Sequence, residues 1–568
     1  MSGLDSSLQS EARAWLADDP DAATREELEA ALARAASGDR AAIADLEDAF
    51  SGTLQFGTAG LRGRMGPGPN RMNIAVVSRA AAGLAAYLRS EVGDARVVIG
   101  YDARYHSRDF AERSAAIMVA AGHHVTLMPE TWPTPVLAYA VRALDADCGI
   151  MVTASHNPAP DNGYKVYLGG RAADADGRGV QIVPPADALI AAEIAGVGPV
   201  TQIPVAPSGW DLASETLVDD YVGQITPVAA NGPKKLRIVH TAMHGVGNTT
   251  MQAAFGRAGF IDVHSVPEQA VPDPDFPTVP FPNPEEKGAM DLALKLAERV
   301  QADLVIANDP DADRCAAAIY DERRAQWRML HGDELGLLLA TYLVDHLGVR
   351  GTLANSIVSS RSLAALATER GLPSVQTLTG FKWIARAPGI AFGYEEAIGY
   401  CVLPEVVKDK DGISAALAIA QLAAILKHDG SSLGALLDDL ARQFGLYLTD
   451  QVSIRVEDLS RIGEMMERLR TAPPETLLGS PAQMTDLADG SVETTGLPPT
   501  DGLLILAEDG TRVIVRPSGT EPKLKAYLEV IAPVPAEASF EDLTEVRDHA
   551  ASRITDLAAE VRAALGVQ

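Results

Sequence analysis

The amino-acid sequence predicts an α/β protein with three α/β domains containing mixed sheets and a smaller α+β domain at the C-terminus. Short apolar runs typical of buried strands alternate with longer amphipathic stretches typical of helices. Most runs end in a polar or glycine-rich loop, and this order of strand, loop and helix recurs along the chain. With 568 residues, the chain is long enough for about three to five domains.

Composition and net charge restrict the kinds of molecule that this protein is expected to bind. The chain is 47% hydrophobic and 22% charged, which is typical of a globular protein. Its net charge is −28, from 76 acidic and 48 basic residues. Nucleic acids and anionic membranes bind concentrated positive charge, so we expect neither as a partner. A small anionic substrate needs only local positive groups and is compatible with this charge.

The cysteines and the apolar segments indicate a cytoplasmic protein. Cys148, Cys315 and Cys401 are odd in number, far apart and flanked by apolar residues, so we expect reduced core thiols. Residues 1–16 lack the basic start and apolar run of a signal peptide. The longest charge-free apolar segment, 413–426, is too short to span a bilayer and predicts a buried helix.

The first domains follow from the order of the apolar runs. Residues 1–50, with leucine and isoleucine at helical spacing, predict an N-terminal helical extension. Residues 51–210 are expected to form domain I, and residues 211–325 domain II. The strands and helices expected in domain I are 96–101, 108–122, 124–128, 135–144 and 148–152. Those expected in domain II are 235–240, 288–300 and 303–307, with a long irregular loop at 267–284.

The rest of the chain predicts two further domains. Residues 326–445 are expected to form a third α/β domain that closes with helices. Residues 446–568 alternate strands and helices and are expected to form the C-terminal domain.

The segment 153–158, Thr-Ala-Ser-His-Asn-Pro, directly follows the apolar run 148–152. An Asn-Pro step stops regular structure, so a polar turn is expected at the end of a buried strand. Loops at strand ends of α/β sheets are common places for catalysis. Ser155 and His156 are therefore candidate catalytic residues, with an ordinary turn and a capping serine as the structural alternative.

Asp309, Asp311 and Asp313 alternate after the apolar run 303–307, and in an extended loop they would project to one side. Oxygen-only ligands favour a hard cation, with Mg²⁺ ahead of Ca²⁺ or Mn²⁺. An EF-hand loop is excluded because its sixth and twelfth positions would be arginine and tyrosine. A solvated acidic loop is the remaining alternative.

These three carboxylates leave room in the coordination shell for another anionic oxygen. A phosphoserine would supply it, because a phosphoryl group carries about −1.5 to −2 charges and three acceptor oxygens. Ser155 is the candidate for this modification.

Further polar segments fit a phosphorylated ligand. The segment 516–520, Arg-Pro-Ser-Gly-Thr, combines a guanidinium, hydroxyls and a flexible glycine, and Lys523 lies close by, so phosphate binding or a tight turn between strands is expected. Glu395 and Glu396 lie between glycines and would accept hydrogen bonds from hydroxyls or form a solvated turn. Lys165 and Lys382 would transfer protons if the site lowers their pKa values, and are otherwise surface lysines. Arg62, in a glycine-rich segment, would meet an anion.

Together these motifs resemble the α-D-phosphohexomutase family of phosphoglucomutases, phosphomannomutases and their relatives. The motifs occur in the family's order at 56–63, 153–158, 309–314, 393–396 and 516–522. The forms at 56–60 and 379–383 are most similar to the phosphoglucomutase/phosphopentomutase branch. The resemblance covers nearly everything after the first 50 residues and implies four domains around a central cleft.

The resemblance also implies roles for individual residues. It implies a phosphorylated Ser155 that completes a Mg²⁺ site with Asp309, Asp311 and Asp313. Lys165 would be the general acid or base, Arg62 would stabilise the transferring phosphoryl group, and Lys382 falls where some relatives carry a histidine. His156 is placed with the catalytic residues. The substrate-binding residues would be Arg314, Thr379, Gly380, Glu395, Glu396, Arg516, Ser518, Gly519, Thr520 and Lys523.

The expected activity is the interconversion of glucose 1-phosphate and glucose 6-phosphate through a sugar 1,6-bisphosphate. Pentose phosphates and mannose phosphates are the next candidates. A metal-dependent sugar phosphatase and a non-catalytic sugar-phosphate sensor are the alternatives from other classes. The sequence leaves open whether the protein is a monomer or a dimer.

Overall fold

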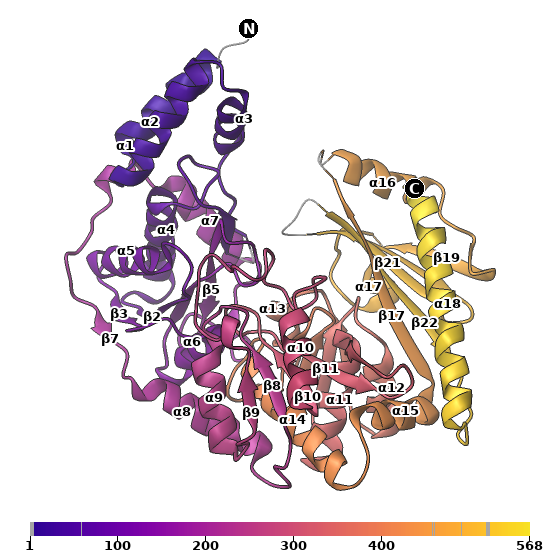
Figure 1. Cartoon of the computed structure of the whole chain (residues 1–568). Helices are drawn as coiled ribbons and strands as arrows, with labels where there is room; N and C mark the ends of the chain where they lie inside the picture. The colour runs from indigo at the N-terminus through magenta and orange to yellow at the C-terminus, as the bar shows by residue number, and fades with distance from the viewer. Residues whose placement is uncertain are drawn as a thin grey trace. The chain divides into compact units, whose positions relative to one another are not determined.

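The computed structural model describes residues 5–57, 60–456, 458, 460–489, 491–518 and 523–567. The chain forms two compact units (Figure 1). Unit 1 consists of Met1–Ala317 with Gly399–Gln421, and unit 2 consists of Ala318–Ile398 with Leu422–Gln568. Each unit is therefore built from two separate stretches of the chain.

The N-terminal segment of unit 1 is helical, with α1 (Ser6–Asp18), α2 (Ala22–Ala36) and α3 (Arg40–Ala49). The carboxylates of Asp21 and Asp39 accept hydrogen bonds from the first free amides of α2 and α3, which is the usual way to start a helix. Leu28 and Leu46 are buried in a small core between these helices. Hydrophobic residues at helical spacing thus form a packed segment of their own.

The first sheet of unit 1 has the strand order β1-β5-β4-β2-β3-β7, with β6 paired to β5. Its strands are β1 (Leu61–Arg64), β2 (Arg96–Tyr101), β3 (His124–Leu127), β4 (Cys148–Val152), β5 (Asp161–Leu168), β6 (Val180–Gln181) and β7 (Asp211–Leu212). Its helices are α4 (Ile74–Val92), α5 (Ser107–Ala120), α6 (Thr134–Ala143) and α7 (Ala186–Gly196). The sheet is mixed, because β2 pairs in parallel with β3 and β4, whereas β5 pairs antiparallel with β4 and β1.

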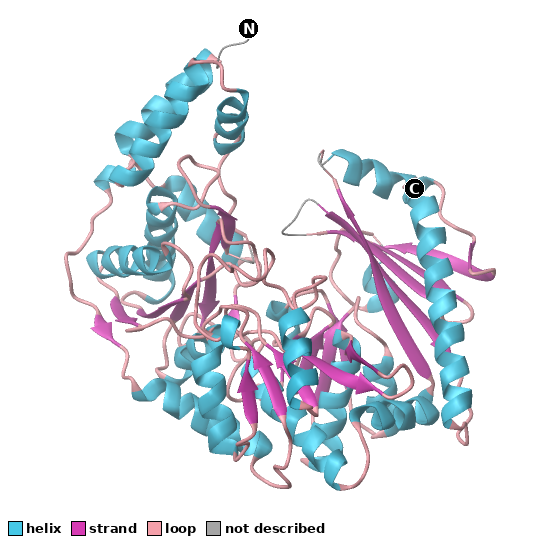
Figure 2. Cartoon of the chain, viewed as in Figure 1, coloured by secondary structure: helices cyan, strands magenta, loops and turns pink. Residues whose placement is uncertain are grey.

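Helices cover both faces of this sheet, which explains the continuous apolar runs of β2 and β4 (Figure 2). On β2, Val97 and Ile99 pack in the core with Leu84 of α4. A Cβ atom on Gly100 would instead meet Leu137 of α6. Successive residues therefore face opposite layers, as the pleat of a strand requires.

The second sheet contains parallel strands in the order β10-β8-β9 within unit 1. The elements here are α8 (Thr216–Ile225), β8 (Ile238–Thr241), α9 (Gly247–Ala258), β9 (Val263–Ser265), α10 (Asp291–Val300) and β10 (Leu304–Ala307). The chain passes into unit 2 within β11 (Ala316–Asp321). It returns to unit 1 with β16 (Gly399–Cys401) and the first part of α14 (Gly412–His428).

Unit 2 begins with a parallel sheet in the order β14-β13-β15. The elements of this part are β12 (Gln326–Met329), α11 (Gly332–Thr341), β13 (Thr352–Ser356), α12 (Ser362–Glu369), β14 (Ser374–Thr377), α13 (Phe381–Ile384) and β15 (Ile390–Glu395). β11 and β12 form an antiparallel hairpin.

The C-terminal part of unit 2 is an antiparallel sheet in the order β17-β22-β21-β20-β19-β18. Its strands are β17 (Leu446–Arg455), β18 (Thr476–Leu477), β19 (Ser480–Asp486), β20 (Leu503–Ala507), β21 (Arg512–Pro517) and β22 (Lys523–Ala532). Its helices are α15 (Leu433–Phe444), α16 (Ser460–Thr471), α17 (Ser491–Thr495) and α18 (Phe540–Leu565). Leu543 and Leu557 of α18 pack into the hydrophobic core of this sheet.

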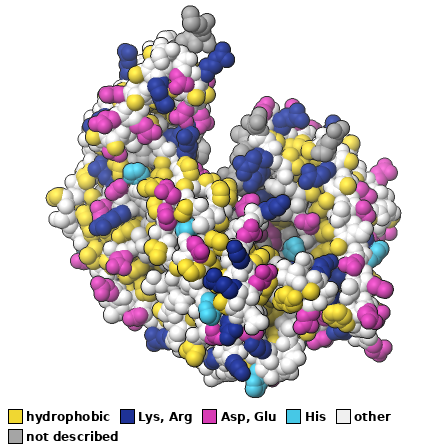
Figure 3. All heavy atoms as spheres, viewed as in Figure 1, with side chains coloured by type: hydrophobic (Ala, Val, Ile, Leu, Met, Phe, Trp, Pro, Cys, Tyr) yellow, Lys and Arg dark blue, Asp and Glu magenta, His cyan; other side chains and the backbone are white. Residues whose placement is uncertain are grey.

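The predicted fold class, three α/β domains with mixed sheets and an α+β C-terminal domain, is confirmed. The central cleft and the four domain boundaries stay predictions. All three cysteines are buried and unpaired. No helix within the described ranges is long and apolar enough to cross a membrane. Acidic and basic side chains are interspersed over the face drawn in Figure 3.

Candidate active site and metal centre

Ser155 lies in the turn between β4 and β5 and has left-handed backbone geometry, with φ 52°. This conformation is costly for a residue with a side chain, by about 1–3 kcal/mol, and persists only where the surroundings hold it. The Thr153 hydroxyl accepts a hydrogen bond from the Ser155 amide at 2.9 Å. The result is a serine that is only 2% exposed, with its hydroxyl aimed at the loop after β10.

Arg104 holds this turn from behind. Its guanidinium donates hydrogen bonds to the carbonyl oxygens of Ser155 at 2.6 Å, Pro158 at 2.9 Å and Asp161 at 3.1 Å, and also to that of Asn157. A planar guanidinium with five N–H donors is suited to gathering several carbonyls in this way. Arg104 is therefore a positioning residue for the Ser155 turn.

The loop after β10 carries the three aspartates on a tight turn rather than on an extended strand. The Asp309 carbonyl accepts a hydrogen bond from the Ala312 amide at 2.8 Å, and Ala312 has φ 56°. The expectation that alternation in an extended loop brings the carboxylates together is therefore wrong. They converge because the chain reverses between Asp309 and Asp313.

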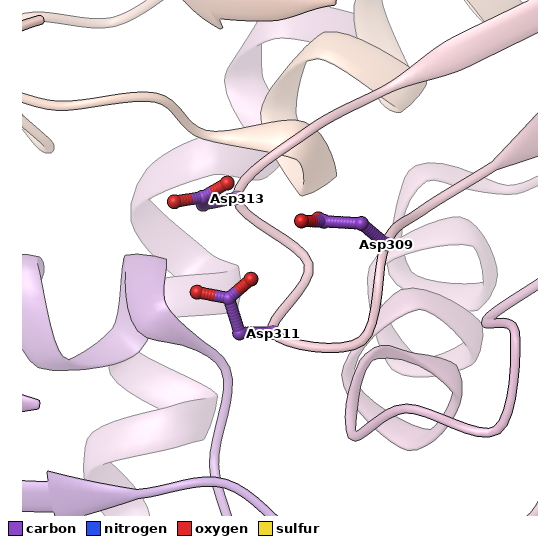
Figure 4. A group of neighbouring side chains, drawn as sticks. All are labelled: Asp309, Asp311 and Asp313. Carbon is purple, nitrogen blue, oxygen red and sulfur yellow. The ribbon is translucent and has the colours of Figure 1, made fainter. Parts of the chain in front are cut away.

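Asp309, Asp311 and Asp313 are all fully buried, and one ligand oxygen from each lies within 4.8 Å of those of the others. Figure 4 shows the three carboxylates converging on a common space. One oxygen of Asp311 and one of Asp313 are buried without a hydrogen-bond partner. Buried carboxylate oxygens normally have partners, so this donor set fits a hard divalent cation.

Ser155 joins this acidic triad across 154 positions of sequence. Its hydroxyl donates a hydrogen bond to the Asp309 carboxylate at 2.7 Å. Burial and the neighbouring Asp311 and Asp313 carboxylates raise the pKa of Asp309 well above its usual range. The predicted proximity of the serine and the aspartates is thus present within unit 1.

Two lysines neutralise part of the acidic charge. Lys165, on β5, contacts Asp311 and Asp313, each at 2.7 Å, and Lys410 lies 3.2 Å from Asp313. Burial lowers the pKa of Lys165, but the two carboxylates outweigh burial, so the pKa is raised. Lys165 therefore carries a proton in this arrangement. The Thr134 hydroxyl donates a further hydrogen bond to Asp311 at 2.6 Å.

The remaining predicted residues of unit 1 surround this centre. The His156 ring lies 3.4 Å from the Ser155 hydroxyl, and burial followed by Arg314 and Arg62 lowers its pKa well below the usual value. Arg314 lies 4.0 Å from Asp309, and its amide donates to the same carboxylate. Arg62, on β1, donates to the side chain of Asn157 at 3.3 Å. Of these residues, Arg62 and Arg314 are cations of the kind that bind anions.

In unit 2, the predicted sugar-binding glutamates lie at and after the end of β15. Glu395 is the last residue of β15, and Glu396 follows it. One Glu396 oxygen accepts hydrogen bonds from the hydroxyls of Ser359 at 2.9 Å and Ser356 at 3.1 Å. Burial, and then the charge of Asp333, raise the pKa of Glu396. The loop is thus held in place by serines of its own unit.

The predicted phosphate-binding segment lies between the antiparallel strands β21 and β22, as the alternative of a connection between strands requires, and phosphate binding stays a prediction. The Ser518 amide donates to the Lys523 carbonyl at 2.9 Å. Arg516 lies near the end of β21 and hydrogen-bonds the hydroxyl of buried Tyr527, whose pKa is raised by burial and by Glu396. Arg516 and the loop with Glu396 therefore both lie beside Tyr527. Gly519 and Thr520 lie outside the described residues.

The other predicted residues of unit 2 lie around the start of α13. Gly380 precedes the helix with φ 105°, a conformation that favours glycine. Thr379 comes before it, and Lys382 lies in the first turn, with both side chains half-buried.

Comparison with known proteins identifies the chain. Profiles described as phosphoglucomutase/phosphomannomutase, alpha/beta/alpha domains I, II and III, and C-terminal domain, match residues 53–195, 219–322, 331–444 and 452–545. The chain belongs to the phosphoglucomutase/phosphomannomutase family. It is therefore an enzyme, an isomerase that moves a phosphoryl group. The suspected family resemblance is confirmed.

Relatives within this phosphoglucomutase/phosphomannomutase family carry different names. A "probable phosphomannomutase" of Haemophilus influenzae is 46% identical over 82% of this chain and 94% of its own. The phosphopentomutase of Homo sapiens is 34% identical over 98% and 96%. A phosphoglucomutase of Staphylococcus haemolyticus is 34% identical over 85% and 91%. The open form of Paramecium parafusin shares the fold, with a TM-score of 0.68 at 20% identity, covering 91% of this chain and 96% of that one.

Some residues of this family member's site escaped the sequence analysis. Lys410 lies in a run of alternating lysines and aspartates that was not noticed, and Asp409 beside it accepts a hydrogen bond from the Tyr167 hydroxyl at 2.7 Å. Arg104 lies just beyond the strand expected at 96–101 and was not among the predicted site residues. Alternating charge before a buried helix was the one available signal for Lys410, whereas nothing local distinguishes Thr134.

Proposed function

We propose that the protein is a phosphosugar mutase that works through a phosphorylated Ser155. The observation that carries the proposal is the 2.7 Å contact between the Ser155 hydroxyl and Asp309, within a buried triad of carboxylates. A buried serine among acids is a poor nucleophile for water-exposed chemistry. A phosphoryl group on this serine would add negative charge beside the carboxylates, so it requires a cation such as the one that the triad would hold.

The acidic triad supports the choice of cofactor. Asp309, Asp311 and Asp313 would hold Mg²⁺, which would neutralise charge on the transferring phosphoryl group. Phosphoryl transfer depends mainly on positioning and charge neutralisation. Arg62 and Arg314 add fixed positive charge beside Ser155, as their effect on the neighbouring imidazole indicates.

The reaction moves one phosphoryl group in each half. The bond between phosphorus and the Ser155 oxygen breaks, a bond between phosphorus and a free hydroxyl oxygen of the sugar monophosphate forms, and a base takes up the proton of that hydroxyl. Lys165 is the candidate general acid or base, and it would donate a proton to the Ser155 oxygen once a cation takes up the charge of Asp311 and Asp313, which otherwise raise its pKa. The sugar 1,6-bisphosphate then turns around and returns its other phosphoryl group to Ser155. Lys382 is the second candidate for proton transfer.

Unit 2 would bind the substrate. Glu395 and Glu396 would accept hydrogen bonds from sugar hydroxyls, since carboxylates are acceptors only. The segment 516–520, which begins with Arg516, would hold the phosphate that does not react, because a guanidinium matches phosphate geometry. Glu396 and Arg516 both lie beside Tyr527, so one continuous surface would bind the sugar and its distal phosphate.

Glucose 1-phosphate is the proposed substrate, because the motifs at 56–60 and 379–383 are similar to those of the phosphoglucomutase/phosphopentomutase branch. Ribose 1-phosphate is the second candidate, since the human phosphopentomutase aligns with 98% of the chain. Kinetic constants for glucose, ribose and mannose 1-phosphates, measured side by side, would rank them. A kcat/KM for glucose 1-phosphate below that for either competitor would overturn this choice.

Intact mass and one substitution test the phosphoserine. The purified protein should carry an adduct of about 80 Da at Ser155. Ser155→Ala should lose both the adduct and isomerisation of all three sugar phosphates, whereas the exposed Ser214→Ala should lose neither. Full activity of Ser155→Ala would refute the proposal. Release of one inorganic phosphate per sugar phosphate consumed would identify a phosphatase instead.

A further inference from the structure

The N-terminal helices are the part of unit 1 to which neither the sequence motifs nor the proposed chemistry gives a role. The family profile for domain I starts at residue 53, after these helices. α3 nevertheless contacts the segment that follows β1. Arg64 lies 3.0 Å from Asp45, while Arg71 lies 3.2 Å from Asp45 and 2.7 Å from Asp48. Two acids of α3 thus hold two arginines that flank a single loop.

The contact is more than a surface ion pair. Arg71 is only 4% exposed, and a buried guanidinium requires charged or carbonyl partners. Backbone atoms also contribute to this contact. The Asn70 amide donates a hydrogen bond to the Ala49 carbonyl at 3.0 Å, and the Asn70 side chain donates one to the Asp48 carbonyl at 3.1 Å. The end of α3 and the loop 65–72 are therefore fixed to each other through main chain and side chains.

This loop is continuous with the strand that carries Arg62. The Arg64 carbonyl accepts from the Met72 amide at 2.9 Å, so the base of the loop is closed by the last residue of β1. Arg62 and Arg64 are two residues apart on β1 and so share a face. Arg62 pairs with Gly163 of β5 and donates to Asn157 in the Ser155 turn. A shift of the loop would therefore move Arg62 relative to Ser155.

We propose that α3, through Asp45 and Asp48, is a positioning element that sets Arg62 against the Ser155 turn. This inference rests on the proposed function, in which Arg62 stabilises the transferring phosphoryl group. Neither aspartate is among the residues expected to bind the sugar or the phosphate. Their effect passes through Arg71, Arg64 and β1, and it acts on the transfer step rather than on substrate binding.

The test uses the full chain with Asp45→Asn and Asp48→Asn combined. Both carboxylates are substantially exposed, so the amide replacements keep shape and solubility. We expect kcat to fall about 10- to 100-fold with KM changed by less than about threefold, because small misplacements of a catalytic group have effects of this size. Amides of 61–72 should also exchange hydrogen faster. Glu47→Gln, which removes one carboxylate from an exposed site of α3, should change none of these.

A double-mutant cycle distinguishes positioning from general structural damage. In an Arg62→Lys background the two aspartate substitutions should lower kcat by less than about twofold more, since both act through the same group. Effects of Arg62→Lys and the aspartate pair that multiply in full would overturn the inference. So would faster exchange at 61–72 with unchanged kcat.

A milder variant and the hydrogen-exchange measurement test the inference even if the double aspartate variant fails to fold. If the double variant does not fold, Arg64→Gln removes one contact from an exposed arginine, and it should lower kcat in the same direction. A wild-type protein that isomerises no sugar phosphate would refute the proposed function. Exchange at 61–72 would then still report whether α3 holds β1.

Discussion

Replacing Arg104 by lysine tests how the protein maintains the Ser155 turn. The two terminal nitrogens of the Arg104 guanidinium donate hydrogen bonds to the carbonyl oxygens of four residues. A lysine has one nitrogen with three protons, so at least one bond must be lost. Because hydrogen bonds from charged donors contribute about 1.5–3 kcal/mol each, Arg104→Lys should destabilise the turn by about 2–3 kcal/mol.

That loss is comparable to the backbone strain that the clamp holds. The left-handed geometry of Ser155 costs about 1–3 kcal/mol, so the weakened turn should relax. A relaxation of about 1 Å at Ser155 would lower activity by about 100-fold if Ser155 carries the phosphoryl group as proposed. The assay is sugar 1-phosphate isomerisation with chemical unfolding of the same samples. Arg108→Lys is the matched control, since Arg108 is exposed and pairs only locally with Glu112.

The reasoning would be refuted if Arg104→Lys kept more than about half of the activity, with a stability loss no larger than the ~0.5 kcal/mol typical of surface changes. It would also be refuted if Arg108→Lys lost as much activity as Arg104→Lys. Lower stability with unchanged kcat would show that the geometry of Ser155 persists without the Arg104 guanidinium.

Three further predictions concern the metal site, the proton donor and pH. Adding Mg²⁺ to metal-free protein should raise the melting temperature, by the equivalent of about 2.7 kcal/mol at 100 times Kd, and Asp309→Asn should remove most of this rise; an undiminished rise would place the ion elsewhere. Lys165→Met should lower kcat about 10²–10⁴-fold, and the same loss with exposed Lys295→Met would contradict its role. Burial raises the pKa of Glu334, but Arg328, bound at 2.7 Å, outweighs burial and lowers it to about 2. A depressed carboxyl pKa stabilises the folded state above its unfolded pKa, so this contribution, at most about 3 kcal/mol, should fade as pH falls from about 4.5 to 2. Glu334→Gln should be less stable at neutral pH and lack that part of the acid dependence, and an unchanged acid-unfolding curve would contradict it.

Elements with strong periodicity could be predicted from the sequence. The strand expected at 96–101 is β2, Arg96–Tyr101, and the helix expected at 135–144 is α6, Thr134–Ala143. The buried helix expected at 413–426 lies within α14, Gly412–His428. Continuous apolar runs and clear turn residues determine such elements locally. The predicted ends of helices and strands were less accurate than their positions. For example, α10 was expected to start at residue 288, and it starts at Asp291.

Residues whose roles come from tertiary contacts could not be predicted in the same way. The three aspartates were recognisable because one short segment carries all of them. Lys410 contacts Asp313 although it comes nearly a hundred positions later in the chain. Thr134 contacts Asp311 although it comes much earlier in the chain. Their partners are set by the packing of β4, β5 and β10, which no local pattern encodes. The role of Arg104 could not be predicted either. Its hydrogen-bond acceptors are backbone carbonyl oxygens, which every residue has, so the sequence does not distinguish them.

The discontinuous make-up of unit 1 constrains how the protein is synthesised. Gly399–Gln421 belongs to unit 1, yet it leaves the ribosome only after 318–398 has been made. Lys410, one of the two lysines that neutralise the acidic loop, arrives with this late segment. Nascent chains that end before it expose an acidic centre short of one cation. Vectorial folding of unit 1 therefore finishes only once an intervening part of unit 2 has been translated.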